Sequence, residues 1–366
     1  MNESERASAA VMDGADRSRF AVAALESFVA AVYRALGVRT VHAQVGARVL
    51  VAAHLRGFET HGLACLAGYV RCLKEGRFNA RPRIRLRRRA PWAAILDGDN
   101  GLGHVAAHRA MRAAILAARD FGIGVVGVRR SNHIGAAGVY PLMAAAEGMI
   151  GVTMANSAPS VAPFGSRRPF LGTSPLAVAV PAVVHPPFVL DMATAAAARR
   201  KIFEAAEAGR PIPAGWALGA DGQPTTDAAA AMKGVSLPVG GAKGSAMAML
   251  VDVLAGALTG AEFAGRVLST VTNTERPSAS GNLHVALRVD AFMAPYQFAR
   301  RMEMLAARVE ALPPAPGFDE VRLPGVRGAR LEAELRTHGV PLPAALAAGL
   351  AELGAGLGVG FPLQLA

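Results

Sequence analysis

The segment IGVVGVRRSNH, residues 123–133, decides the fold class of this chain. Its first half, residues 123–128, is apolar and rich in β-branched side chains, which predicts a buried strand. Its second half is polar, ends in His133 and leads into a glycine-spaced segment typical of a helix. A histidine between a strand and a helix lies near backbone N–H groups that have no partner within the helix. That position suits proton transfer beside a bound anion or cofactor.

Short apolar runs continue on the C-terminal side of this segment, separated by loops rich in Gly, Pro, Ser and Asn, which is an α/β pattern with a sizeable sheet. Helical spacing of apolar residues dominates on its N-terminal side. Residues 209–233 lack periodicity and predict a long loop. We predict strands at residues 83–87, 93–96, 123–128, 150–154, 176–180 and 188–190, and helices at 19–36, 40–55, 60–73, 104–118, 195–206, 244–258, 292–312 and 344–353.

The 366 residues are enough for two domains, and 52% hydrophobic content allows a large core. The pattern divides into a flexible extension (1–18), a mainly helical substrate and dimerisation domain made from both chain ends (19–120 with 310–366), and a sheet domain (121–309). No apolar run reaches about 18 residues, so no membrane span is expected. The extension lacks the apolar segment of a signal peptide. Cys65 and Cys72, about two helical turns apart, cannot form a disulfide bond, which favours the reducing cytoplasm.

The formal net charge is +12, which attracts anions. Nucleic acid is one interpretation, but the basic runs have no interleaved aromatics and accompany no known nucleic-acid-binding motif. A solvated basic face is the simpler interpretation, and an anionic cofactor or substrate is the next.

Three loop segments carry residues suited to binding a nucleotide. Ser157 lies in a loop of small polar residues after a strand, where hydroxyl groups can meet phosphate or ribose. Asp191 ends another strand, and it either caps the following helix or orients a histidine or a cofactor hydroxyl. Lys243 lies in a GGAKG segment before a helix, where it can meet a phosphate.

Several enzyme classes are excluded by the motifs that the sequence lacks. There is no Walker motif, and the glycines of GIGVVG at 122–127 lie within a predicted strand, not in a turn after one. A standard Rossmann site is therefore disfavoured. No His, Cys or acidic residues occur at zinc-ligand spacing, so we expect no metal site. The GxSxG elbow of the hydrolases is also absent.

Nine segments together resemble the malate/L-lactate dehydrogenase-like oxidoreductases, a family that includes sulfolactate, ureidoglycolate and diketogulonate dehydrogenases and ketimine (piperideine/pyrroline-2-carboxylate) reductases. They occur in the family's order and cover most of the chain beyond residue 18. The segments are LRG to THG (55–62), DGDNGLG (97–103), SNH (131–133), NSAPSVAPFG (156–165), LGTSPL (171–176), DMAT (191–194), PTTD (224–227), GGAKG (240–244) and LTG (258–260).

The resemblance implies a non-Rossmann nucleotide-binding domain with a mixed sheet, a homodimer, and an active site in a cleft between domains. It implies that His61 and His133 are the catalytic histidines, and that Thr60, which replaces a usual serine, lies at the substrate. It places NAD(P) against Ser157, Asp191, Met192, Ala193, Lys243, Gly325, Val326 and Arg327. Without the family pattern, His61 would be read as a satisfied interior histidine.

Two positions depart from the family. Cys65 stands where an arginine usually lies four residues after the histidine, one helical turn along, and a neutral thiol cannot clamp a carboxylate. The substrate then differs, or Arg167 or Arg168 takes over. Arg200 stands where a glycine is usual, and its charge near a ribose 2′-phosphate would favour NADP over NAD.

The sequence thus predicts an NAD(P)-dependent oxidoreductase that reduces a small 2-oxo acid, or oxidises the 2-hydroxy acid, with a histidine supplying or accepting the proton. One alternative is a ketimine reductase that uses the same site. The other is a basic binding protein on this scaffold whose catalysis is impaired.

Overall fold

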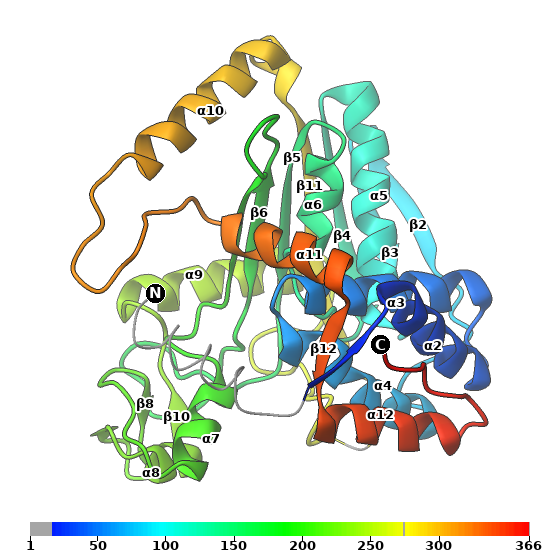
Figure 1. Cartoon of the computed structure of the whole chain (residues 1–366), viewed down its shortest axis with the longest axis vertical. Helices are drawn as coiled ribbons and strands as arrows, with labels where there is room; N and C mark the ends of the chain where they lie inside the picture. The colour runs from blue at the N-terminus through cyan, green and yellow to red at the C-terminus, as the bar shows by residue number, and fades with distance from the viewer. Residues whose placement is uncertain (1–16, 274, 366) are drawn as a thin grey trace.

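The computed structural model describes residues 17–273 and 275–365. Its centre is a seven-stranded sheet in the order β2-β3-β4-β11-β5-β6-β7, in which β3 and β4 are parallel and all other neighbours are antiparallel (Figure 1). This confirms the mixed sheet expected from the sequence. The strands are β2 (Arg85–Ala90), β3 (Ala93–Asp97), β4 (Ile123–Ser131), β5 (Met149–Ala155), β6 (Leu176–Val180), β7 (Phe188–Met192) and β11 (Ser280–Arg288).

Helices cover both faces of this sheet. On one face α5 (Gly103–Phe121) packs on β4 and β11, and α6 (Val139–Ala145) packs on β5 and β6 (Figure 1). The other face carries η3 (Asp252–Ala257), a π-helical turn that continues α9 (Ala242–Val251) and packs on β11, β5 and β4. Glycines allow these close approaches, because a Cβ at Gly124 would lie 1.9 Å from the Ala114 carbonyl oxygen and one at Gly281 would lie 1.9 Å from that of Ala255.

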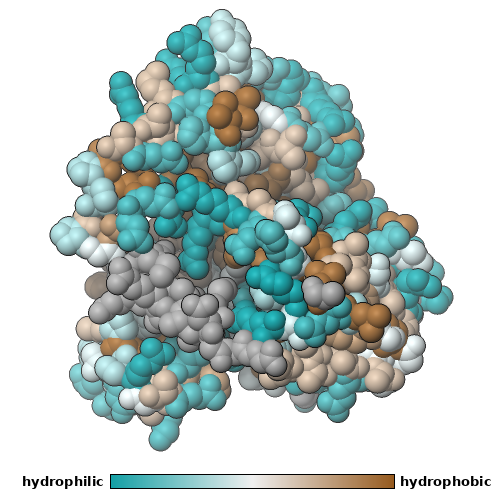
Figure 2. All heavy atoms as spheres, viewed as in Figure 1, coloured by the Kyte–Doolittle hydropathy of each residue, from teal (hydrophilic) through white to brown (hydrophobic). Residues whose placement is uncertain are grey.

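A helical layer lies beside the sheet and continues its core. It contains α2 (Val22–Ala35), α3 (Thr40–Leu55), α4 (Leu66–Lys74), α11 (Val326–His338) and α12 (Ala344–Ala355). The chain ends meet here, since β1 (Arg17–Phe20) pairs with β12 (Val340–Pro343). The helix α10 (Pro295–Glu310) and the short η4 (Val289–Ala291) follow β11. Mainly hydrophilic side chains follow α11 in Figure 2, in keeping with its ion pair between Arg336 and Glu332.

Two predicted boundaries need comment. Residues 1–16 of the proposed extension lie outside the described residues. The boundary between the proposed domains, residues 120 and 121, falls in the last turn of α5, which ends at Phe121, shortly before β4. The sheet already begins before it with β2 and β3.

The predicted loop at 209–233 is wrong in part, because it contains short elements. The strands β8 (Ala217–Leu218) and β9 (Pro224–Thr225) join β10 (Val235–Ser236) in a small sheet beside α7 (Arg199–Glu207) and α8 (Ala228–Lys233). Asp227 caps α8 by accepting hydrogen bonds from the backbone N–H groups of Ala229 and Ala230. Residues 195–198, which were predicted to be helical, precede α7.

The predicted helix at 60–73 is also wrong in its first half. Residues 59–65 form two 3-10 turns, η1 (Glu59–His61) and η2 (Leu63–Cys65), before α4 begins at Leu66. Gly62 separates the turns, and its backbone lies so close to α3 that a Cβ would be 2.9 Å from that of His54. Cys65 therefore does not lie one α-helical turn beyond His61, as the sequence interpretation had assumed.

None of the helices within the described residues is both long and apolar enough to span a membrane.

Candidate active site

A cavity of about 780 Å³ lies where the helical layer meets the sheet. His61 from η1 and His133 from the end of β4 both line it, and their ring centroids are 5.7 Å apart. The structure thus brings together two imidazoles that are 72 positions apart in the chain. A cavity of this size falls in the range of cofactor and ligand sites.

The loop after β4 is held by Asn132, whose side chain is fully buried. Its amide nitrogen donates to the carbonyl oxygens of Asn100 (3.0 Å) and Gly101 (2.9 Å), and its amide oxygen accepts the N–H of Ser278 (3.0 Å). A Cβ at Gly103 would lie 2.1 Å from the Asn132 carbonyl oxygen, so only glycine fits at the start of α5. These contacts fix the backbone from which His133 projects.

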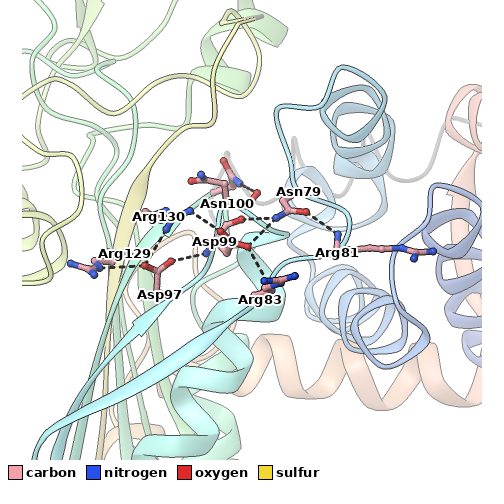
Figure 3. A network of polar contacts seen from close by, with 9 residues as sticks. Asn79, Arg81, Arg83, Asp97, Asp99, Asn100, Arg129 and Arg130 are labelled. Carbon is pink, nitrogen blue, oxygen red and sulfur yellow. Dashed lines mark hydrogen bonds and ion pairs between the residues drawn. The ribbon is translucent and has the colours of Figure 1, made fainter.

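The turn after β3 supports the same loop from outside the cavity (Figure 3). The N–H groups of Gly98 and Asn100 donate to the carbonyl oxygens of Arg129 and Arg130 at 2.9 and 2.8 Å. The Arg130 guanidinium pairs with Asp99 at 2.6 Å. The DGDNGLG segment therefore supports the end of β4.

His133 has one ring nitrogen occupied by protein. Its Nδ1 lies 2.6 Å from the hydroxyl of Tyr69, a buried residue of α4. Nε2 is thus the nitrogen left for the cavity. Burial, assisted by the neighbouring His61, lowers the pKa of His133 to about 4. The ring is therefore neutral near pH 7 and able to accept a proton.

His61 lies at the open side of the cavity, and its Nδ1 is 3.0 Å from the hydroxyl of Thr60. Desolvation of the His61 ring by the surrounding protein lowers the pKa of this histidine as well. Thr60 contacts the histidine and does not itself line the cavity.

Asp191 lines the cavity at the end of β7 and is not a helix cap, because its carboxylate accepts the N–H of Gly138 at 2.8 Å. Gly138 has no room for a side chain here, since a Cβ would lie 2.6 Å from the Asp191 carboxylate. Burial raises the pKa of Asp191 to about 6, against the effects of the Gly138 N–H and the Arg56 charge.

This pKa predicts a pH-dependent stability. Because the folded pKa of about 6 lies above the ordinary value of 3.8, the stability from this group is fully present below the ordinary value and lost as pH rises through about 6. Asp191→Asn does not ionise, and its amide oxygen can still accept the Gly138 N–H. Denaturant titrations should show wild type losing about 3 kcal/mol relative to Asp191→Asn between roughly pH 4 and 7. If the free energies of unfolding of wild type and Asp191→Asn changed in parallel with pH, this result would contradict the raised pKa of Asp191.

The other expected cofactor residues are placed differently. Ser157 and Ala193 line the cavity with Asp191, and the Ser157 hydroxyl is 3.3 Å from that of Thr173. Met192 is half-buried next to them, and Lys243 is exposed in the first turn of α9. Hydroxyl donors and a carboxylate acceptor in one cavity fit the ribose and phosphate groups of a dinucleotide.

The C-terminal segment lies behind β7, outside the residues that line the cavity. Gly325 approaches β7 closely, since a Cβ would be 2.7 Å from the Val189 nitrogen. Val326 is buried in a small core with Leu323 and Ala306, and Arg327 is exposed in the first turn of α11.

The two arginines proposed for the substrate lie elsewhere. Arg167 lines a second cavity of about 860 Å³ with Trp216 and Phe164, and Arg168 is exposed beside it. Arg199, which the sequence interpretation did not single out, lines the cavity of the histidines. Arg200 points to the surface, where it pairs with Glu204 at 2.7 Å.

Residues 267–272 form a further wall of the cavity that the sequence interpretation missed. Arg71 and Arg77 hold this segment by donating to the Thr270 carbonyl oxygen at 3.5 and 3.2 Å. Arg71 lies in α4, an ordinary amphipathic helix, and Arg77 lies just after it, so no sequence signal marked them. Among the described residues no group of three or more His, Cys, Asp or Glu could hold a metal ion.

Comparison with known proteins agrees with this arrangement. A protein-family model described as malate/L-lactate dehydrogenase matches residues 20–351. The chain is 40% identical to L-sulfolactate dehydrogenase of Methanocaldococcus jannaschii, over 80% of this chain and 84% of that protein. It is 37% identical to ureidoglycolate dehydrogenase (NAD(+)) of Escherichia coli O157:H7, over 79% and 82%. It is 34% identical to (2R)-3-sulfolactate dehydrogenase (NADP(+)) of Chromohalobacter salexigens, over 88% and 93%.

Solved structures give the same picture. Sulfolactate dehydrogenase from Methanocaldococcus jannaschii has a TM-score of 0.88 and 36% identity, over 94% of this chain and 98% of that chain. Delta1-piperideine-2-carboxylate reductase from Pseudomonas syringae pathovar tomato has a TM-score of 0.83 and 29% identity, over 92% and 99%. The resemblance inferred from the sequence is confirmed.

Proposed function

The chain belongs to the malate/L-lactate dehydrogenase family and is an NAD(P)-dependent oxidoreductase, and we propose that it interconverts a small 2-oxo acid and its 2-hydroxy acid. The observation that carries this proposal is the pair of histidines 5.7 Å apart on the wall of one cavity. Reduction of a carbonyl group needs a proton on oxygen as well as a hydride on carbon, and an imidazole in the cavity can supply that proton.

Each expected site residue has a proposed task. A bound nicotinamide supplies or accepts the hydride. Ser157, Asp191, Met192, Ala193 and Lys243 hold the dinucleotide, with residues 325–327 supporting them from behind β7. His61 and His133 move the proton, and Thr60 orients His61 through the contact at 3.0 Å.

The substrate carboxylate needs a cation, and Cys65 does not provide one. Arg199 lines the cavity and can take this part, whereas Arg167 faces the neighbouring cavity. Arg167 and Arg168 keep a proposed role only for a substrate long enough to extend toward the second cavity.

Two finer assignments follow from single features. Arg200 adds positive charge at the start of α7 and favours NADP(H) over NAD(H). Exposed apolar side chains follow α9 and η3, namely Met249, Leu250, Val253 and Leu258, and a homodimer contact would cover them. The two free thiols, Cys65 and Cys72, suit the cytoplasm.

A ketimine reductase is the second candidate, and the likeness to the piperideine-2-carboxylate reductase favours it. A C=N substrate needs the same hydride and proton, so the site chemistry is unchanged. The two candidates differ only in the group that is reduced.

A panel of substrates with NADH and NADPH tests the proposal. We expect oxidation of a reduced cofactor by at least one 2-oxo acid, such as oxaloacetate, pyruvate or sulfopyruvate, with NADPH preferred. Activity with cyclic imine carboxylates alone would support the second candidate. A folded protein whose nicotinamide fluorescence shows binding of neither cofactor would reject both and support the impaired binding protein.

A further inference from the structure

Two side chains behind His133, those of Tyr69 and Cys65, form a line of polar contacts that the proposed function does not use. The His133 Nδ1 atom is 2.6 Å from the Tyr69 hydroxyl, and the Cys65 thiol is 3.1 Å from the carbonyl oxygen of Thr60. The Tyr69 hydroxyl and the Cys65 thiol are four residues apart in the chain, and the contact between these side chains affects the pKa of both groups. The line therefore runs from the cavity to a backbone carbonyl.

The final acceptor gives this line a direction. A backbone carbonyl oxygen can only accept a hydrogen bond, so the Cys65 S–H must donate to it. The sulfur is then free to accept the O–H of Tyr69. With its proton so directed, the Tyr69 oxygen can accept the Nδ1–H of His133.

We propose that Cys65 and Tyr69 fix His133 as the Nδ1–H tautomer, which leaves the Nε2 lone pair facing the cavity as the proton acceptor. Both are positioning residues. The inference rests on the proposed function, because it specifies how one of its two histidines works. Cys65, which replaces the usual arginine, therefore has a positioning role in this proposal.

The surroundings favour a fixed direction. Tyr69 is 3% exposed, and its ring packs against those of His104 (5.2 Å) and Phe78 (6.0 Å). The titratable groups that face His133 are His61 from η1, Tyr69 from α4 and His104 from α5. Burial keeps His104 neutral and keeps the Tyr69 and Cys65 protons in place, because it lowers the pKa of His104 to about 3 and raises that of Cys65 to about 11. No nearby group therefore competes for the Nδ1 proton.

The proton balance of the reaction follows from this tautomer. In the oxidising direction the hydroxyl proton of the 2-hydroxy acid moves to Nε2 while the hydride leaves carbon for NAD(P)⁺, and the product carbonyl forms. The resulting imidazolium keeps its Nδ1–H bond to Tyr69. Reduction reverses each transfer.

Nitrogen-15 NMR of histidine-labelled protein at pH 7 reads the tautomer without requiring turnover. We expect the Nδ1–H form of His133 in wild type. In Cys65→Ala the Tyr69 O–H loses its acceptor and turns to donate to Nδ1, so the ring should change to the Nε2–H form. The kcat of Cys65→Ala should fall about 100-fold, with the cofactor KM unchanged, because the cavity-facing nitrogen is then protonated.

Two variants separate this effect from general disruption. Cys65→Ser keeps a donor and an acceptor, and should retain the Nδ1–H form and most of the activity. Tyr33→Phe is the matched control, because the buried Tyr33 hydroxyl has no hydrogen-bond partner in the described structure. It should change neither the tautomer nor kcat.

An Nε2–H signal for His133 in wild type, or a Cys65→Ala protein with unchanged tautomer and kcat, would overturn the inference. Failure of the proposed function looks different. The tautomer would then respond to Cys65→Ala as expected, while no substrate is turned over by any variant.

Discussion

His133→Ala is expected to lower kcat by a factor of about 1,000 while the protein still binds NAD(P)H with nearly wild-type affinity. In the proposed mechanism the imidazole transfers the proton, whereas other residues that line the cavity, Ser157, Asp191 and Ala193 among them, would hold the cofactor. Steady-state kinetics gives kcat, and nicotinamide fluorescence titration gives the cofactor Kd.

His61 provides the comparison for this variant. If the two imidazoles act as one unit, His61→Ala and the double variant should lose about as much activity as His133→Ala alone. His338→Ala, at the end of α11, serves as the control and should behave as wild type. Wild-type turnover in His133→Ala would refute the proposed role, and loss of cofactor binding would make the residue a binding contact.

Asn132→Ala is expected to have the largest effect on stability. It removes the three hydrogen bonds of a buried side chain, to the Asn100 and Gly101 carbonyl oxygens and from the Ser278 N–H. Each is worth about 1 kcal/mol, so the free energy of unfolding should fall by about 3 kcal/mol. The loop that presents His133 should also become less ordered, and kcat should fall with it.

The control for Asn132→Ala is Asn100→Gly. Asn100 has φ +52° and uses its backbone carbonyl to meet Asn132, and glycine adopts this conformation without strain. Chemical denaturation of Asn100→Gly should therefore give a stability close to that of wild type. Equal losses in the two variants would mean that the turn itself, and not the Asn132 side chain, supports the loop.

The sequence predicted the parts of the fold that have strong periodicity. Apolar spacing predicted these elements close to where they lie, namely the strand at 123–128, the helices α2 and α3, and the amphipathic helix α10. The central strand β11 was missed because Asn282 and His284 interrupt its apolar pattern. In the fold both are fully buried, and the His284 ring bonds Thr153 and Asn282 at 3.0 and 2.8 Å. Such internal pairing is invisible in a single sequence.

The site was predictable only where motifs pointed to it. His133, Ser157 and Asp191 were named from their places after predicted strands, and the family resemblance added His61 and Ala193. The structure places all five on one cavity. Tyr69 was missed because an aromatic residue on an apolar helix face reads as core. The segment 267–272 and Arg199 were missed because only tertiary packing brings them to the cavity. Arg167 and Arg168 were chosen by their order in the chain, which does not give their distance from the cavity.

The most direct test of the account is a structure of the protein with NADPH and a non-reactive 2-oxo acid analogue bound. We expect C4 of the nicotinamide and the carbonyl carbon of the analogue to lie together in the cavity between His61 and His133, with the carbonyl oxygen within hydrogen-bond distance of an imidazole. A nicotinamide bound elsewhere, for example in the cavity beside Trp216, would contradict it.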